Sequence, residues 1–170
     1  MTNIEIKARH QRTRLTDETL VKIGAQFDRI ETQTDTYFDV KNGRLKIRER
    51  DSGVPQLIQY FREDSEGPRP SFYELVHLKD VRKVKKTLEN EHGIRVIVRK
   101  KREIWIWENV RIHFDIIENL GDFIEFEAVI GSDTDISMEQ KRVEFLIEEF
   151  GISKNELIGQ SYGDLLIGSK

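Results

Sequence analysis

The chain has 170 residues, of which 37% are hydrophobic and 35% are charged, well above the roughly 25% charged residues of an average soluble protein. The two signs nearly cancel, because the formal net charge is only -3. This balance argues against a general nucleic-acid-binding protein, which is usually basic. The sequence contains no cysteine, which excludes disulfides, thiolate metal sites and a cysteine nucleophile.

The first residues, MTNIEIKARH, contain no apolar run of the kind found in a signal peptide. No stretch of the sequence approaches the roughly 20 apolar residues of a membrane-spanning helix. We therefore expect a cytoplasmic protein with no membrane partner. The polar stretch 63–70 has the glycine and prolines of an exposed loop and is too short for a domain linker, so residues 1–170 are predicted to form a single domain.

Alternating apolar and polar residues predict strands, and apolar residues three to four apart predict helices. In chain order, we predict the strand 3–9, the helix 16–23, the strands 34–39, 44–50, 57–62 and 71–78, the helix 80–92, the strands 94–99, 103–107, 110–116 and 123–130, the helix 137–150 and a short final helix at 162–166. Many strands with helices inserted between them indicate an α+β fold with a predominantly antiparallel sheet.

The polar faces of these strands are sorted by charge. Because alternate side chains of a strand point to the same side, 44–50 carries four cations on one face, whereas Glu125 and Glu127 share a face of 123–130. A solvated sheet face explains any one strand taken alone. A surface usually mixes the two signs, however. Separate groups of cations and carboxylates suit a polyphosphate, which binds Arg and Lys, together with its metal ion, which prefers carboxylate oxygens.

Other conspicuous residues have ordinary structural explanations. His113 is interpreted as a wall or surface residue, with a ligand or base as the alternative. Trp105 and Trp107 are interpreted as outward packing or a cover for a tunnel mouth. The basic run 82–86 lies on a predicted helix, where a solvated face is the usual explanation, so no nucleic-acid partner is predicted.

Several segments together resemble the CYTH superfamily, the triphosphate tunnel metalloenzymes, and in particular its class IV adenylate cyclase branch. The family signature is a Glu-x-Glu-x-Lys strand, and here it reads Asn3-Ile4-Glu5-Ile6-Lys7, with Asn3 in place of the first acid. The resemblance continues, in the family's order, through TDTYFDVKNGRLKIRER (34–50), LIQYFRED (57–64), VRKKREIW (98–105), DIIENLGDFIEFEAVI (115–130) and SYGDLL (161–166).

The resemblance implies a closed eight-stranded antiparallel β-barrel, or tunnel, with peripheral helices and with the polar strand faces turned inward. It also implies a Mg²⁺ or Mn²⁺ cofactor, and it allows a homodimer. The residues that resemble the family's metal ligands are Glu5, Asp115, Glu125 and Glu127. Those that resemble its triphosphate-binding cations are Lys7, Arg44, Lys46, Arg48, Arg62, Lys100 and Arg102, of which Lys7, Arg48 and Arg102 are the predicted catalytic residues.

Three functions remain open on this resemblance. An adenylate cyclase would convert ATP to cyclic AMP and pyrophosphate. A triphosphatase would hydrolyse thiamine triphosphate or inorganic triphosphate. A binding module would hold a polyphosphate or nucleotide without turnover, and the neutral Asn3 keeps this third function under consideration.

Overall fold

A computed structural model describes residues 2–62, 64–131 and 135–169. Its strands are β1 (Thr2–Arg9), β2 (Gln26–Phe38), β3 (Arg44–Arg50), β4 (Gln56–Phe61), β5 (Arg69–His77), β6 (Ile94–Trp107), β7 (Val110–Ile117) and β8 (Gly121–Ile130). Its helices are α1 (Arg14–Ile23), α2 (Val81–His92), α3 (Ile136–Glu149), a 3-10 turn (Lys154–Glu156) and α4 (Tyr162–Gly168).

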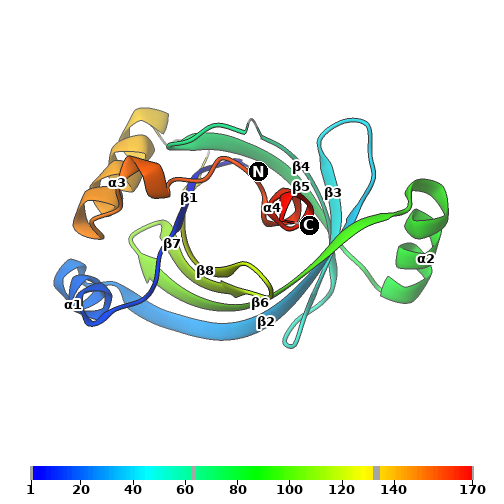
Figure 1. Cartoon of the computed structure of the whole chain (residues 1–170), viewed down its shortest axis with the longest axis horizontal. Helices are drawn as coiled ribbons and strands as arrows, with labels where there is room; N and C mark the ends of the chain where they lie inside the picture. The colour runs from blue at the N-terminus through cyan, green and yellow to red at the C-terminus, as the bar shows by residue number, and fades with distance from the viewer. Residues whose placement is uncertain (1, 63, 132–134, 170) are drawn as a thin grey trace.

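The eight strands close into an antiparallel barrel in the order β1-β5-β4-β3-β2-β6-β7-β8, with β8 pairing back to β1. Figure 1 shows α1 and α3 at one side of the barrel, α2 at the opposite side and α4 over its middle. The α+β class and the closed eight-stranded barrel predicted from the sequence are confirmed. No helix among the described residues combines the length and the apolar character needed to cross a membrane.

Three local predictions were wrong. The segments 94–99 and 103–107 belong to one strand, β6, because the run of charges between them continues the alternation instead of ending it. Strand β2 begins at Gln26 and not at residue 34. The first half of β2 pairs with β6, but its residues are mostly exposed and show no alternation that would predict a strand. Helix α1 begins at Arg14, two residues before the predicted start, because the hydroxyl of Thr13 caps it by accepting a hydrogen bond from the Thr16 amide.

Strand β1, which carries part of the predicted site, is buried on both faces. On β1, the polar side chains Asn3, Glu5 and Lys7 lie inside the barrel and are only 4%, 7% and 4% exposed. The alternate residues Ile4 and Ile6 face outward and are fully buried by the helices. The solvated-face explanation therefore does not hold for this strand, and its polar side chains need partners inside the barrel.

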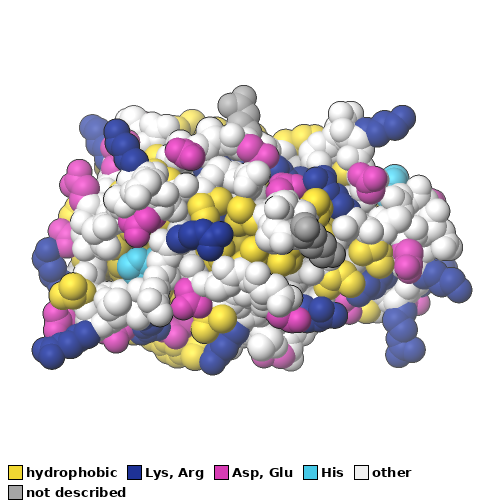
Figure 2. Space-filling model, viewed as in Figure 1, with side chains coloured by type: hydrophobic (Ala, Val, Ile, Leu, Met, Phe, Trp, Pro, Cys, Tyr) yellow, Lys and Arg dark blue, Asp and Glu magenta, His cyan; other side chains and the backbone are white. Residues whose placement is uncertain are grey.

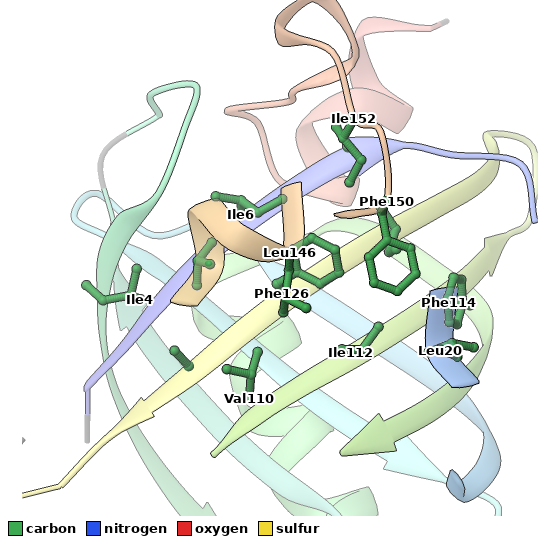
Figure 3. Packing of buried hydrophobic residues seen from close by; sticks show 14 residues of the cluster. Ile4, Ile6, Leu20, Val110, Ile112, Phe114, Phe126, Leu146, Phe150 and Ile152 are labelled. Carbon is green, nitrogen blue, oxygen red and sulfur yellow. The ribbon is translucent and has the colours of Figure 1, made fainter. Parts of the chain in front are cut away.

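The main hydrophobic core lies between the outer wall of the barrel and the helices. Outward-facing residues of β1, β7 and β8 pack against Leu146 of α3, against Phe150, which follows α3, and against Leu20 of α1 (Figure 3). Trp107 stacks on Phe145 of α3 with ring centroids 5.3 Å apart, and Trp105 packs against the same core. The interpretation of both tryptophans as outward packing is confirmed.

Helix α2 covers a second part of the outer wall. Its apolar residues Val81, Val84 and Leu88 pack against a small core that contains Ile47 of β3. The helix is described throughout and buries none of its residues completely, and most of the basic run 82–86 is exposed. This arrangement agrees with a solvated basic face.

The face of the molecule drawn in Figure 2 mixes the two signs of charge. Basic and acidic side chains are interspersed over it. Such mixing is what solubility favours. This face therefore does not show the sorting of charge that the inward strand faces have.

We predict that Phe126→Ala lowers the free energy of unfolding by about 3–5 kcal/mol, because it empties a fully buried site in the main core. Urea denaturation measures the change. The matched control is Val21→Ala on α1, where the side chain is 80% exposed and the expected change is within about 0.5 kcal/mol. Equal effects of the two substitutions would contradict this placement of the core.

Candidate functional site

The barrel encloses a cavity of about 250 Å³ whose wall receives side chains from all eight strands and from α4. Because side chains alternate along each strand, closing the barrel brings the inward residues of distant strands together. The predicted site residues that line the cavity are Glu5, Lys7, Lys46, Arg48, Arg62, Lys100, Arg102, Glu125 and Glu127. The two that lie outside its lining are Arg44 and Asp115.

Two glutamates and a histidine form the anionic part of the wall. Glu125 and Glu127 lie on β8, and His113 is the cross-strand neighbour of Glu125 on β7. One ligand atom from each of the three lies within 4.8 Å of the other two. Glu5 is the cross-strand neighbour of Glu127 on β1, so it borders this group. A cluster of this kind can hold a divalent cation.

Neighbouring cations keep Glu125 ionised. Burial raises the pKa of Glu125, but the nearby Lys7 and Arg102 lower it more, so the net direction is well below the usual value. The closest contact is a hydrogen bond of 2.7 Å from Arg102 Nη2 to Glu125 Oε2. Lys7 Nζ lies 3.8 Å from Glu125 Oε1. The carboxylate is thus charged at neutral pH, which metal binding requires.

Burial also acts on the imidazole of His113. It lowers the pKa of His113, and the positive charge of Arg102 lowers it further, while Glu127 and Glu125 raise it by less. The net direction is below the usual histidine value, so the ring is neutral at pH 7. The structure places His113 in the cavity wall, at 2% exposure, as one of the two sequence interpretations had it.

Asp35 organises the first group of cations. Arg48 donates two hydrogen bonds of 2.7 Å to its carboxylate, and Lys46 donates one of 2.8 Å. Burial raises the pKa of Asp35, but Arg48 and Lys46 lower it more, to well below its usual value. A bidentate pair of this type fixes the plane of the guanidinium.

Asp115 organises the second group. It is 1% exposed and accepts hydrogen bonds of 2.7 and 2.5 Å from Arg102, while Lys100 Nζ lies 3.7 Å away. Tyr162 of α4 donates a further hydrogen bond of 2.8 Å to it. In this structure Asp115 is therefore a buried partner of cations inside the barrel that does not itself line the cavity, and its predicted role as a metal ligand stays a prediction.

The third group joins Glu5 to the arginines of β5 and of the segment after β4. Arg62 donates a hydrogen bond to Glu5 Oε1, and Arg69 lies 4.0 Å from the same oxygen. Arg69 also donates to the carbonyls of Ile158 and Gly159, which ties the segment before α4 to the barrel. Glu5 thus faces cations as well as its neighbour Glu127, and its predicted metal-binding role remains untested.

Arg44 belongs to the edge of the site. Its guanidinium binds Asp64 at 2.7 Å and Asp164 of α4 at 2.9 Å, and it lines a small separate pocket. Its contacts hold α4 against the barrel. The predicted role of Arg44 in triphosphate binding has less geometric support than that of Arg48 or Arg102.

Lys100 has an unusual pKa for a lysine. Burial lowers it, Arg102 and Arg48 lower it further, and Asp115 and Asp35 raise it by less, which brings it to about 7. The side chain lines the cavity at 6% exposure of the residue. At neutral pH Lys100 is therefore divided between its charged and neutral forms.

Sequence reasoning missed several residues of the wall. Asp35 was absent from the predicted set although it alternates with Gln33 and Tyr37 on β2, and this alternation was the available signal. Arg69 stands at the first position of β5, before the predicted strand, and only the pairing of β5 with β1 places it beside Glu5. Tyr162 reaches the site because α4 returns to the barrel.

Several buried polar atoms in the wall have no hydrogen-bond partner among the described residues, and Asn3 Oδ1 and His113 Nδ1 are among them. Buried polar atoms are normally paired, so such orphans indicate room for a ligand. Oxygen and imidazole nitrogen are ordinary metal donors. His113 Nδ1, which forms one group with Glu125 and Glu127, therefore fits a divalent metal ion together with these two carboxylates.

Comparison with known proteins extends these observations. The model of the CYTH domain family matches residues 1–162. A Methanocaldococcus jannaschii protein named "Putative adenylate cyclase MJ0240" is 28% identical over 185 aligned positions, which cover 97% of this chain and 98% of that protein.

Solved structures share the fold. PH1012 from Pyrococcus horikoshii OT3 has a TM-score of 0.81 at 20% identity, over 96% of this chain and 98% of that one. HpAC1 from Hippeastrum, described as a "putative adenylyl cyclase" with a dominant triphosphatase activity, has a TM-score of 0.67 at 18% identity, over 99% of this chain and 96% of that one. At these identities the structures establish the fold alone.

We predict that binding of inorganic triphosphate takes up a proton above pH 7. The anion stabilises the charged form of Lys100, whose pKa in the free protein is about 7. Affinity should then fall as the pH rises above 7, by at most about tenfold per pH unit for this one proton. Calorimetry in buffers of different ionisation enthalpy counts the protons.

The control is Lys100→Arg, which keeps the positive charge at every pH tested. Titration of the ligand is the same for both proteins, so the difference between them isolates Lys100. Identical proton uptake by wild type and Lys100→Arg would contradict the prediction.

Proposed function

Since the chain belongs to the CYTH domain family, whose model matches residues 1–162, we propose that it is a metal-dependent enzyme acting on a nucleoside or organic triphosphate. Proteins of this family are commonly enzymes. The reaction we favour is that of a class IV adenylate cyclase, in which ATP gives cyclic AMP and pyrophosphate. The proposal takes residues 1–170 as one functional domain.

The observation that carries the proposal is the separation of charge inside the cavity. Arg48 and Arg102 each have their guanidinium oriented by a buried carboxylate. Glu125 and Glu127 form an anionic region with His113, and Arg102 borders this region through its hydrogen bond to Glu125. A triphosphate bound to a divalent ion also carries its two signs in separate places, with negative charge on the phosphate oxygens and positive charge on the metal ion. Phosphoryl transfer depends mainly on positioning and charge neutralisation, which such a wall supplies without a protein nucleophile.

Each group of residues has a role in this scheme. Arg48, Arg102 and Lys7 bind phosphate oxygens and neutralise the charge that develops on the leaving pyrophosphate. Lys46, Arg62 and Lys100 line the same cavity and bind further phosphate oxygens of the triphosphate. Glu125 and Glu127 would hold Mg²⁺ or Mn²⁺, with Glu5 and Asp115 as further proposed ligands, and the ion would supply charge neutralisation at the reacting phosphate.

The nucleophile decides the product. When the ribose 3′-hydroxyl of ATP attacks the α-phosphorus, the bond to the β-phosphate oxygen breaks, pyrophosphate leaves and the hydroxyl proton is released. The cyclase reaction is supported by the name of the Methanocaldococcus jannaschii relative, which aligns over nearly the whole chain. The proposal takes ATP as the substrate.

The second candidate is a triphosphatase acting on thiamine triphosphate or inorganic triphosphate. Here water attacks the terminal phosphorus, and orthophosphate and a diphosphate result. The observation that favours it is the Hippeastrum structure, a cyclase-like barrel described with a dominant triphosphatase activity. The same wall residues serve both reactions, so only the orientation of the substrate differs.

We expect the protein to turn over ATP in the presence of Mg²⁺ or Mn²⁺ and to form cyclic AMP and pyrophosphate, identified by chromatography and mass spectrometry. Thiamine triphosphate and inorganic triphosphate are tested in parallel. The double variant Glu125→Gln, Glu127→Gln should lose activity by on the order of 100-fold or more, because charge neutralisation at the phosphates is lost.

The control for this variant is Glu118→Gln, which makes the same chemical change at an exposed position in the turn between β7 and β8. It should leave turnover unchanged. Orthophosphate and a diphosphate, without cyclic AMP, would favour the triphosphatase, and metal-dependent ATP binding without turnover would favour a binding module. Full activity of the double variant would refute the assignment of the metal site.

The neutral Asn3 gives a separate prediction. Its side chain lines the cavity with an unpaired Oδ1, diagonal to Glu127 across the β1–β8 pair. Asn3→Glu should raise the affinity for Mn²⁺ by about tenfold, because it adds a carboxylate near the proposed ion. Calorimetric titration with Mn²⁺ measures the effect, and Gln59→Glu, which adds the same charge on the outside of β4, is the control. Equal affinities of both variants would place Asn3 outside the metal site.

A further inference from the structure

His113 occupies a position on the inner wall where the cavity is lined by carboxylates. It lies on β7, opposite Ile104 of β6 on one side and Glu125 of β8 on the other. Its side chain is 3% exposed, and the residue lines the cavity. The imidazole is therefore held in place by the sheet on both sides and directed into the barrel.

The Nδ1 atom of His113 lies at a suitable distance from both glutamates. It is 3.9 Å from Glu125 Oε2 and 4.0 Å from Glu127 Oε1. Two ligands of one transition-metal ion cannot be farther apart than about 4.2 Å, which is twice a metal–nitrogen bond of about 2.1 Å. Both separations fall inside this limit, so the ring nitrogen can share an ion with an oxygen of either glutamate.

Hydrogen bonding does not explain the position of this ring nitrogen. Separations of 3.9 and 4.0 Å exceed the range of a hydrogen bond. Within the described part of the chain, His113 Nδ1 has no other partner. A buried nitrogen left unpaired beside two carboxylates costs free energy, and a bound cation would remove that cost.

Strand β1 gives a second reason to expect a metal ligand on β7. Where the family signature has an acid, this chain has the neutral Asn3, and its remaining acid, Glu5, receives a hydrogen bond from Arg62. The carboxylates that β1 contributes to a metal are thereby reduced. A ligand from β7 completes a three-residue donor set together with the two glutamates of β8.

We propose that His113 Nδ1 is a direct ligand of the divalent metal ion held by Glu125 and Glu127, and that it shifts the metal preference of the site from Mg²⁺ towards Mn²⁺ and Co²⁺. This inference rests on the proposed function, because it concerns the same ion. Mg²⁺ takes oxygen ligands almost exclusively, whereas imidazole nitrogen binds the later first-row metals well. A site with one nitrogen and two carboxylates therefore discriminates against Mg²⁺.

Pulsed electron paramagnetic resonance of the full chain loaded with Mn²⁺ tests the proposal without an assay of activity. The spectrum should contain the coupling of a directly bound ¹⁴N nucleus. Protein labelled with ¹⁵N-histidine should replace it with the ¹⁵N pattern, a result that needs no variant. His113→Asn, which places an oxygen near the position of Nδ1, should abolish the coupling.

The control variant is His92→Asn, which removes an exposed histidine of α2 far from the cavity and should leave the spectrum unchanged. Calorimetry gives a second measurement. The ratio of Co²⁺ to Mg²⁺ affinity should fall by about tenfold or more in His113→Asn, in the range usual for disturbed metal sites.

The outcomes separate this inference from the proposed function. Nitrogen coupling that is lost in His113→Asn and kept in His92→Asn supports it. Mn²⁺ binding that depends on Glu125 and Glu127 but shows no histidine coupling overturns the role of His113 and leaves the metal site in place. Mn²⁺ binding that is absent, or that survives Glu125→Gln with Glu127→Gln, overturns both.

Discussion

Inside the barrel, Asp35 and Asp115 each bind an arginine through two hydrogen bonds and lie beside a lysine as well. Burying an ion is costly unless a partner of opposite charge compensates for it. The cations of β3 and β6 are buried only because β2 and β7 supply these carboxylates in the adjacent register. The strands must therefore pair in this register for the buried charges to be compensated.

The same requirement explains the helices. A barrel with a polar interior leaves its apolar residues on the outside, where they would meet water. Helices α1 and α3 cover Ile6, Ile112 and Phe126 on one side, and α2 covers Ile47 on another. The hydrophobic core therefore lies outside the sheet, and the interior is free to bind a charged ligand. Tyr162 of α4 connects the two systems, since it is buried in an apolar cluster while its hydroxyl binds Asp115.

The ion pairs that line the cavity have a functional consequence. Arg102 bridges Asp115 and Glu125, so it connects the cationic and anionic regions of the wall. Its two partners fix the guanidinium before any ligand enters. Preorganised donors of this kind stabilise developing charge without the cost of reorganisation. The metal-binding and phosphate-binding roles proposed for this cavity are therefore coupled through one side chain.

Much of this protein was determined by the sequence alone. Alternation of side chains identified most strands and put Lys7, Arg48 and Glu125 on their polar faces. The order of motifs indicated the family, and the resemblance implied that these faces turn inward. Local pattern could not identify the partners of Asp35, Arg69 or His113, because those partners lie on other strands. Their surroundings depend on the pairings β2–β3, β1–β5 and β7–β8, and on the closure of β8 onto β1. Only the tertiary structure decided which charges meet, since alternation sets the face of a residue and strand register sets its neighbours.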